Sequence, residues 1–215
     1  MSSMSLVSLL KKVCGRLLTF MAHHQYRHIH KTARIDYTAI VYNPANIVME
    51  ENTNIDGKAI IMNSRSKLVL KKNSGAAVGL VAITGNHMSV VGKNIKQVTD
   101  RVKDILDVNH EMDKDILVDE DVWIAAQVTL LAGAHLGRGC EIGAGSVVRG
   151  TVPPYAVVIG NPCKVVGFRF TPEEIIEHEI AQYEEEERLP FDLLKKNYEK
   201  YFLNRIKDIK QFTKL

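Results

Sequence analysis

The chain has 215 residues, of which 46% are hydrophobic, 7% aromatic and 25% charged, and its formal net charge is +3. This composition is typical of a soluble domain with an appendage, and it holds no charge block of the kind that binds nucleic acid. Three widely spaced cysteines, Cys14, Cys140 and Cys163, form no CxxC pair, so we expect neither a disulfide framework nor a zinc finger. They indicate a reducing compartment and hence a cytoplasmic protein, whose low aromatic content predicts a core of small aliphatic side chains.

The first segment of the chain is predicted to be an amphipathic helix. Its apolar residues recur at helical spacing: Leu6, Leu9, Leu10, Val13, Leu17 and Met21. Cations at Lys11, Lys12 and Arg16 interrupt the apolar run, so it is too short to span a membrane. We expect its apolar face to pack on a neighbouring surface or subunit, and contact with a membrane surface is the less favoured alternative.

A group of histidines follows this helix: His23, His24, His28 and His30. Metal sites usually combine histidine with cysteine or carboxylate ligands at fixed spacing, and neither pattern accompanies these residues. No metal site is therefore expected.

A six-residue repeat runs from about residue 118 to 152. An aliphatic residue occupies its first position: Val118, Ile124, Leu130, Leu136, Ile142 and Val148. A mostly small or β-branched residue follows four places later: Val122, Val128, Ala134, Cys140, Ser146 and Val152. This period predicts a left-handed parallel β-helix, in which three hexapeptides form each triangular coil and both positions point inward. Glycines such as Gly139 and Gly145 would supply turn conformations at the corners.

The repeat continues upstream in a weaker form. Aliphatic residues there keep the step of six: Ile35, Val41 and Ile47. They predict early coils from about residue 33 to 86. Residues 88–115 lack the repeat, and we expect them to form a loop that protrudes from the solenoid and carries a short helix near 95–106.

The C-terminal part is predicted to be helical. Residues 155–170 read as a last partial coil. Thr171 then offers a capping hydroxyl and Pro172 a proline at the first helical position, so a helix is expected to begin there. The tail should break at Pro190 and resume, with the acidic run 184–187 on a solvated helix face.

The predicted fold is thus mainly β, in three parts. An N-terminal helical segment covers residues 1–32. The β-helix covers residues 33–167, with the loop 88–115 inserted, and a helical tail covers residues 168–215.

The segment DVWIAAQVTLLAGAHLGRGCEIGAGSVVRGTVPPYAVVIGNPCKVV closely resembles the C-terminal signature of hexapeptide-repeat acyltransferases. That family includes the maltose and galactoside O-acetyltransferases and the xenobiotic acetyltransferases. The likeness is strong over residues 118–167 and weaker over residues 33–117. It implies a homotrimer that binds acetyl-CoA in a groove between neighbouring β-helices, so that two subunits share each active site.

The resemblance also implies a catalytic histidine at the end of an early coil, and the segment TGNHMS places His87 there. A sugar hydroxyl must lose its proton as it attacks a thioester, and imidazole, with an ordinary pKa of about 6.5, can take that proton and pass it to the CoA thiolate. The tetrahedral oxyanion needs a fixed donor, which the resemblance assigns to the backbone amide of Ala126, beside the cofactor. Asn86 and His110 are candidate contacts to the acceptor.

Further residues match positions that contact CoA in the family. Trp123 matches a tryptophan that lines the pantetheine channel, and Ala144 matches a position whose backbone contacts the pantetheine arm. Lys164 matches a basic position that meets the CoA phosphates. Arg149 stands where the family usually has threonine, which puts its CoA role in doubt. Ala125 replaces the glycine of the VWIG segment, a change that the repeat tolerates.

The predicted function is acetyl-CoA-dependent O-acetylation of a saccharide or a saccharide-containing acceptor through a ternary complex. No serine or cysteine is paired with His87 by motif, so no covalent acyl-enzyme is expected. A xenobiotic (antibiotic) O-acetyltransferase is an alternative, although the tail lacks the aromatic pair common in those enzymes. A γ-type carbonic anhydrase would need three zinc-binding histidines, and only His87 and His135 lie in coils. A non-catalytic scaffold would not require His87, Trp123 and Lys164 together.

Overall fold

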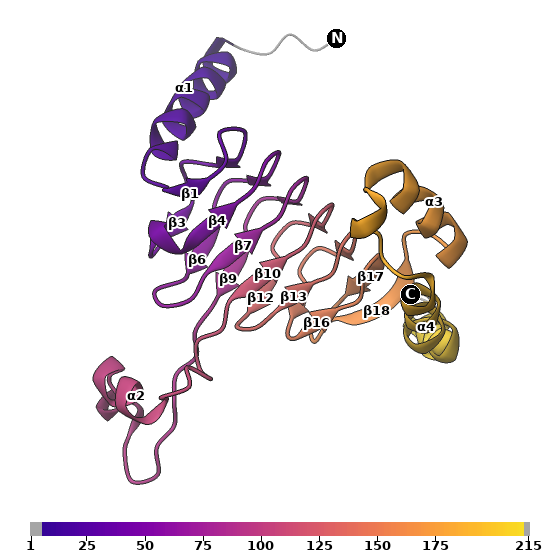
Figure 1. Cartoon of the computed structure of the whole chain (residues 1–215). Helices are drawn as coiled ribbons and strands as arrows, with labels where there is room; N and C mark the ends of the chain where they lie inside the picture. Colours follow the sequence, from indigo (N-terminus) through magenta and orange to yellow (C-terminus); the bar gives the residue numbers. More distant parts are fainter. Residues whose placement is uncertain (1–5, 213–215) are drawn as a thin grey trace.

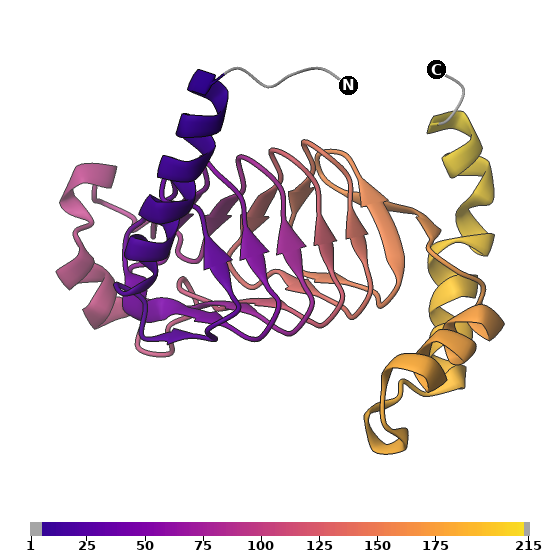
Figure 2. The same ribbon diagram turned by 90° about the horizontal axis from the view of Figure 1, so that it is seen from above.

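The computed structural model describes residues 6–212, which form a triangular prism of short parallel strands with helices at both ends (Figure 1). Sheet A contains β1 (His28–Ile29), β4 (Ile47–Met49), β7 (Leu68–Leu70), β10 (Ile116–Val118), β13 (His135–Leu136) and β16 (Thr151–Val152). Sheet B contains β2 (Arg34–Ile35), β5 (Asn54–Ile55), β8 (Gly75–Ala76), β11 (Trp123–Ile124), β14 (Glu141–Ile142), β17 (Ala156–Ile159) and β18 (Lys164–Phe168). Sheet C contains β3 (Ile40–Val41), β6 (Ile60–Met62), β9 (Val81–Ile83), β12 (Thr129–Leu131) and β15 (Val147–Val148). The chain visits A, B and C in turn, which is the course of a parallel β-helix (Figure 2).

The prism is filled by the two inward positions of the repeat. The first-position residues Val118, Ile124, Leu130, Leu136, Ile142 and Val148 are at most 1% exposed. The fifth-position residues Val122, Val128, Ala134, Cys140, Ser146 and Val152 are at most 3% exposed. The hexapeptide prediction is therefore confirmed, and burial of these aliphatic columns supplies the main stabilisation of the prism.

The corners need positive φ, and glycine is only one way to reach it. Gly139 has φ +69, and a Cβ there would lie 2.5 Å from the Tyr155 ring, so this position excludes a side chain. Asp121 (φ 56) and Gln127 (φ 59) adopt the same region at other corners. A count of the glycines in the repeat therefore underestimates how many corners have a positive φ.

The early coils begin sooner than predicted, because β1 starts at His28 rather than near residue 33. Its side chains continue sheet A, with His28 paired to Val48. The last predicted coil is also only half right. Strand β17 adds to sheet B in parallel, but β18 turns back and pairs with β17 antiparallel, which ends the helical winding.

A loop between β9 and β10 leaves the prism and carries α2 (Asp100–Leu106) away from it (Figure 1). The predicted helix over 95–106 is divided into a 3₁₀ turn at Ile95–Gln97 and α2. Asn94 caps the turn by accepting hydrogen bonds from the amides of Lys96 and Gln97. The loop thus has structure of its own, as its length suggested.

The tail packs on the C-terminal end of the prism through α3 (Pro172–Gln182) and α4 (Phe191–Tyr201). Helix α5 (Ile206–Phe212) follows, and 3₁₀ turns lie at Glu185–Glu187 and Leu203–Arg205. Another 3₁₀ turn, Pro44–Asn46, precedes β4. Thr171 caps α3 by accepting from the amide of Glu174 at 3.3 Å, as predicted. The acidic run, predicted as a helix face, is instead the exposed 3₁₀ turn.

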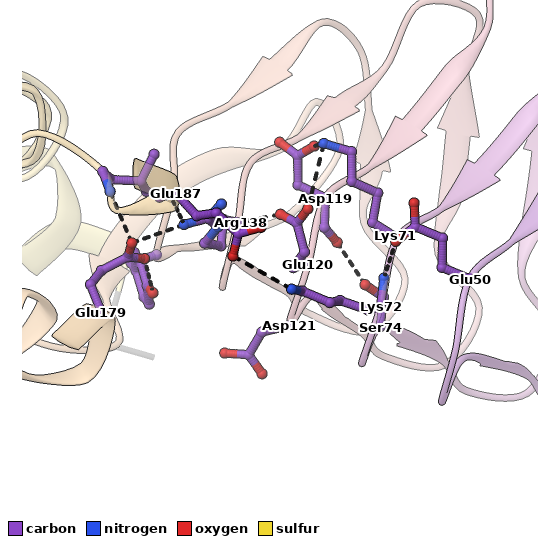
Figure 3. Close-up of polar contacts among 12 residues, drawn as sticks. Glu50, Lys71, Lys72, Ser74, Asp119, Glu120, Asp121, Arg138, Glu179 and Glu187 are labelled. Atoms are coloured by element: carbon purple, nitrogen blue, oxygen red, sulfur yellow. Dashed lines mark hydrogen bonds and ion pairs between the residues drawn. The ribbon is translucent and has the colours of Figure 1, made fainter. Parts of the chain in front are cut away.

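A network of ion pairs connects successive coils along one corner of the prism and extends to the C-terminal tail (Figure 3). Lys71 reaches Asp119 at 2.8 Å, and Arg138 lies 3.3 Å from Glu120. Arg138 also binds Glu179 of α3, at 2.9 Å. Because each contact joins different coils, the network fixes their stacking and anchors α3.

The N-terminal helix α1 (Leu6–His23) packs on the first coil through its small and polar side. Thr19 Oγ1 accepts from the amide of Tyr37 at 3.3 Å, and Gly15 faces the Tyr37 ring. Among its described apolar side chains, Leu10, Val13, Leu17 and Met21 are 55–59% exposed. The expectation that this stripe covers a surface is therefore not met within the chain itself. None of the described helices combines the length and apolarity that a bilayer crossing requires.

Candidate active site

His87 lies just beyond the end of β9, where the chain leaves sheet C for the protruding loop. Its side chain is exposed and borders a pocket of about 180 Å³. The outward-pointing side chains of Tyr42, Met62 and Ile83, stacked from three successive coils, form the pocket floor. Such a pocket combines an apolar floor with an accessible imidazole.

The pocket rim is polar and comes from two places in the chain. Ser64 and Arg65 lie in the turn between β6 and β7, and Thr99 and Asp100 lie at the start of α2. Asn86, a predicted acceptor contact, also borders the pocket with its exposed side chain. Hydroxyl, amide and carboxylate groups at one rim suit a polar, hydroxyl-rich molecule.

The base of the loop is held by a buried ion pair. Lys103 Nζ donates to Asp113 Oδ1 at 2.7 Å and to the backbone carbonyl of Asn86 at 2.9 Å. The side chains of Lys103 and Asp113 are 10% and 5% exposed. Arg65 lies 3.8 Å from Asp113 Oδ2 and pairs with Asp104 of α2. The loop helix is thus tied to the residue that precedes His87.

Two pKa shifts show how strongly the loop is held by polar contacts. Burial works against the charge of Arg65, but the carboxylates of Asp104, Asp100 and Asp113 raise its pKa, so it stays cationic. The amide of Met112 and then that of Glu111 donate to Asp107 and lower the pKa of its carboxyl.

His110 does not border the pocket of His87. It lines an adjacent hollow with Arg65, Ser66, Asp104 and Asp113. Its φ of 53 places it in a left-handed turn near the foot of the loop. Arg65 and Asp113 line both hollows, whereas His87 borders only the first of them and His110 only the second.

The residues predicted to contact CoA lie on other parts of the prism. Trp123 points outward from sheet B, is 47% exposed and lies over Gly75, whose Cβ would be 3.4 Å from its ring. Ala126 and Ala144 stack at the corner between sheets B and C, where Gly145 donates to the Ala126 carbonyl at 3.0 Å. The amide of Ala126 donates to no group within residues 6–212. It is therefore available as a donor, as an oxyanion site requires.

Arg149 and Lys164 lie toward the C-terminal end of the prism. Arg149 is an exposed residue in the turn after β15, and Lys164 is an exposed residue that begins β18. The neighbouring Cys163 amide donates to the Val147 carbonyl at 3.1 Å, which places the two basic residues beside the same coil.

A single chain does not bring these two groups of residues together. Ile83, at the end of β9, pairs with Leu131, at the end of β12. Ala126 lies before β12, and the segment 127–131 separates it from that end of the strand. At roughly 3.3 Å per residue that segment spans about 13 Å, and His87 lies beyond its far end. A general base must come within about 3 Å of the proton it takes. Neither Ala126 nor Ala144 borders the pocket of His87, so one chain shows no single site that contains all three.

Sequence reasoning missed the residues that build the pocket and brace it, chiefly Tyr42, Arg65, Lys103 and Asp113. Side chains in sheet C point inward and outward in turn, and this alternation could have indicated that Tyr42 lies on the outer face. The Lys103–Asp113 pair has no signal in the repeat, because it depends on how the loop folds back. No group of three or more His, Cys, Asp or Glu side chains within residues 6–212 is arranged to hold a metal ion.

The family comparison matches residues 115–150 to the model described as "Bacterial transferase hexapeptide (six repeats)". The chain carries the bacterial transferase hexapeptide repeat. The comparison with curated proteins gave no match. Solved structures with a similar fold include a maltose O-acetyltransferase from Clostridium difficile 630, with 23% identity, 72% of this chain and 81% of the other covered, and a TM-score of 0.55.

Two further structures share the fold. One is a hexapeptide-repeat acetyltransferase of Vibrio cholerae O1 biovar eltor in complex with acetyl coenzyme A, with 18% identity, 78% and 92% coverage, and a TM-score of 0.54. The other is a mutant of the Bacillus cereus N-acyltransferase AntD in complex with dTDP and coenzyme A, with 13% identity, 76% and 95% coverage, and a TM-score of 0.54. These likenesses confirm the predicted left-handed β-helix of the hexapeptide transferases.

Proposed function

We propose that the chain is a CoA-dependent acyltransferase that moves an acetyl group to a hydroxyl of a saccharide or a saccharide-containing acceptor. The observation that carries the proposal is the exposed imidazole of His87 at the rim of a pocket on a hexapeptide-repeat prism. Solved structures of this fold in complex with acetyl coenzyme A or coenzyme A support the donor. The fold alone would not assign the activity, so the chemistry of the site must support it.

The proposed reaction is a direct transfer. His87 takes the proton of the acceptor hydroxyl as that oxygen attacks the thioester carbonyl carbon. The free amide of Ala126 stabilises the oxyanion that forms. The new C–O bond persists, the C–S bond breaks, and the imidazolium returns its proton to the departing thiolate.

The described cysteines fit a mechanism without an acyl-enzyme. Cys140 is fully buried, and burial raises the pKa of its thiol, so its thiolate is suppressed. Burial likewise raises the pKa of Cys163. All three cysteines are free, which supports the proposed cytoplasmic location.

The CoA contacts follow from the outward face of the prism. Trp123 offers an exposed ring for the pantetheine arm, and the small Ala144 leaves room for close approach. Lys164 supplies charge for the phosphates, and Arg149 adds a second cation at the same end of the prism. Two cations at the end of the prism suit the polyanionic part of CoA.

We propose that the active site is completed by a neighbouring subunit of a homotrimer. The separation of His87 from Ala126 in one chain supports this arrangement. The outward face of sheet C supports it too, because it is apolar in the early coils, with Ile40 and Ile60 56% and 38% exposed. Outward positions of sheet B carry Arg34, Asn54 and Glu141 instead. An exposed apolar face of this kind marks an interaction surface.

Subunit mixing tests the shared site. His87→Ala and Trp123→Asp are each expected to be inactive, and co-refolding them should restore activity at interfaces that combine an intact His87 with an intact Trp123. Random mixing makes about a quarter of the interfaces wild type in a cyclic oligomer. We expect about that fraction of wild-type activity. A mixture as inactive as its two parents would contradict the shared site.

An acceptor panel tests the proposed activity. The purified protein is incubated with acetyl-CoA and, in turn, neutral sugars, amino sugars, nucleotide sugars and chloramphenicol-like alcohols, and thiol release is followed. We expect release with at least one saccharide hydroxyl and an O-acetylated product by mass spectrometry. Release only with an amine, or only with the antibiotic alcohol, would reject the proposed acceptor class.

A further inference from the structure

We propose that Lys103 is a positioning residue for His87, acting through the backbone at the base of the loop. This inference rests on the proposed function of His87. Lys103 lies in α2, far along the loop, yet its ammonium group sits against the residue that precedes His87. The helix therefore braces the segment from which the imidazole projects.

Both backbone groups of Asn86 are held from the loop. Its amide donates to the Met112 carbonyl at 2.8 Å, and its carbonyl accepts from Lys103 Nζ at 2.9 Å. Gly85 forms an antiparallel bridge with Asp113. The first and last residues of the loop are thus joined by backbone hydrogen bonds, and Lys103 adds one more at Asn86, the residue before His87.

The strength of this brace follows from its burial. The side chains of Lys103 and Asp113 are 10% and 5% exposed, so neither charge is well solvated. A buried ammonium without its carboxylate is strongly unfavourable, which holds the pair in one geometry. Asp113 Oδ2 makes no hydrogen bond in the described part of the chain, and Arg65 at 3.8 Å is the cation facing it.

Gly85 provides a separate sign that this geometry is built in. A Cβ at residue 85 would lie 2.3 Å from Asp113 Oδ1, the same atom that accepts from Lys103. That atom is pinned and cannot move without breaking the ion pair. Any side chain at residue 85 would therefore displace the brace two residues before His87.

His87 itself has no such support. Its side chain is exposed, and no hydrogen bond to its ring is found among residues 6–212. The point from which its ring projects is then set by the backbone, and so by how firmly Asn86 is held. Misplacing a catalytic group by about 1 Å can cost 100-fold in rate, so loss of the brace should lower kcat.

The test compares Lys103→Met with Lys103→Arg and with Lys114→Met. Lys114 pairs with Glu111 at 2.7 Å in the same loop, but the two side chains are 50% and 64% exposed, so its removal is a matched control. With the acceptor that works best, kcat, KM for acetyl-CoA and the stoichiometry of CoA binding are measured. Amide hydrogen exchange over residues 86–113 is followed in the free protein.

We expect Lys103→Met to lower kcat about 10- to 100-fold. KM for acetyl-CoA and the CoA stoichiometry should stay at wild-type values, and exchange over 86–113 should rise. Lys103→Arg should recover most of kcat, and Lys114→Met should match wild type. If Lys103→Met does not fold, Lys103→Gln, which keeps a hydrogen-bond donor, takes its place in the same measurements with the same expected results.

Two outcomes would overturn the inference. One is a kcat within threefold of wild type in a folded Lys103→Met. The other is a fall in kcat that merely follows a fall in CoA stoichiometry, because that is loss of folded protein. The His87→Ala variant separates the two proposals. If it transfers acetyl as wild type does, the proposed role of His87 as the base fails, and the brace fails with it. An inactive His87→Ala beside a fully active Lys103→Met rejects only the brace.

Discussion

Glu179 offers the sharpest stability prediction, because it is a fully buried carboxylate with three partners. It is 0% exposed and accepts from Arg138 Nη1 at 2.9 Å, from the Tyr155 hydroxyl at 2.5 Å and from the Leu189 amide at 2.9 Å. Arg138 is also held by Glu120 at 3.3 Å and by the Glu187 carbonyl (Figure 3). Glu179 thus links α3 to Arg138 and Tyr155 of the prism and to Leu189 of the tail.

The change Glu179→Ala removes one partner of a buried pair and leaves several groups unsatisfied. Breaking such a pair costs about 3–5 kcal/mol, since an uncompensated charge stays behind. The Tyr155 hydroxyl and the Leu189 amide also lose their acceptor, at about 1–3 kcal/mol each if they stay dry. Because Glu120 still faces Arg138 and energies within one network do not add, we expect a total below the sum of these terms, at about 3–5 kcal/mol.

Urea unfolding and hydrogen exchange measure this effect. We expect the unfolding free energy to fall by that amount and exchange protection to be lost first in α3 and α4, while the prism strands stay protected. Glu186→Ala, an exposed change in the neighbouring acidic turn, should stay within about 0.5 kcal/mol of wild type. A loss below about 1 kcal/mol in Glu179→Ala would show that the anchor is not what holds the tail.

Three further predictions follow from the prism and its outer face. Leu130→Ala, at a 0% exposed axial position, should cost about 2–5 kcal/mol by urea unfolding. Burial alone would raise the pKa of Asp119, but hydrogen bonds from Lys71 and His135 hold it below its ordinary value, so its contribution to stability is present above the unfolded pKa and is lost as pH falls through the folded one. Thermal midpoints between pH 7 and 2 should therefore fall more steeply at acid pH in wild type than in Asp119→Asn, and parallel curves would refute this. Trp123→Ala should raise KM for acetyl-CoA about tenfold with a smaller change in kcat, and an unchanged KM would remove Trp123 from the CoA groove.

The sequence predicted the prism well because its repeat is a direct consequence of packing. Every turn of the coil must place a side chain of limited size on a narrow axis, so the pattern at Val118, Ile124 and Leu130 follows from geometry. The pattern weakens at the ends, where other surfaces cover the strands. The antiparallel return of β18 is set by the tail and has no period of its own.

The site was predictable in part. The position of His87 after an early coil comes from the resemblance to hexapeptide-repeat acyltransferases, whereas its pocket also needs loop residues such as Thr99 and Lys103. The contacts of Lys103 with Asp113 and with the Asn86 carbonyl arise from that tertiary fold, and neighbouring residues in the sequence do not announce them. In our proposal His87 meets the predicted CoA contacts only across a subunit interface, and no local sequence pattern encodes such an interface.

One measurement tests the central claim most directly, namely thiol release from acetyl-CoA by wild type and by His87→Ala with the best acceptor of the panel. CoA binding by calorimetry serves as the control for folding. The general-base role predicts a kcat about 10²- to 10⁴-fold lower in His87→Ala with CoA affinity unchanged. Equal rates in the two proteins would contradict the assignment of His87 as the base, and the absence of acceptor-dependent thiol release from wild type with every acceptor would contradict acyl transfer itself.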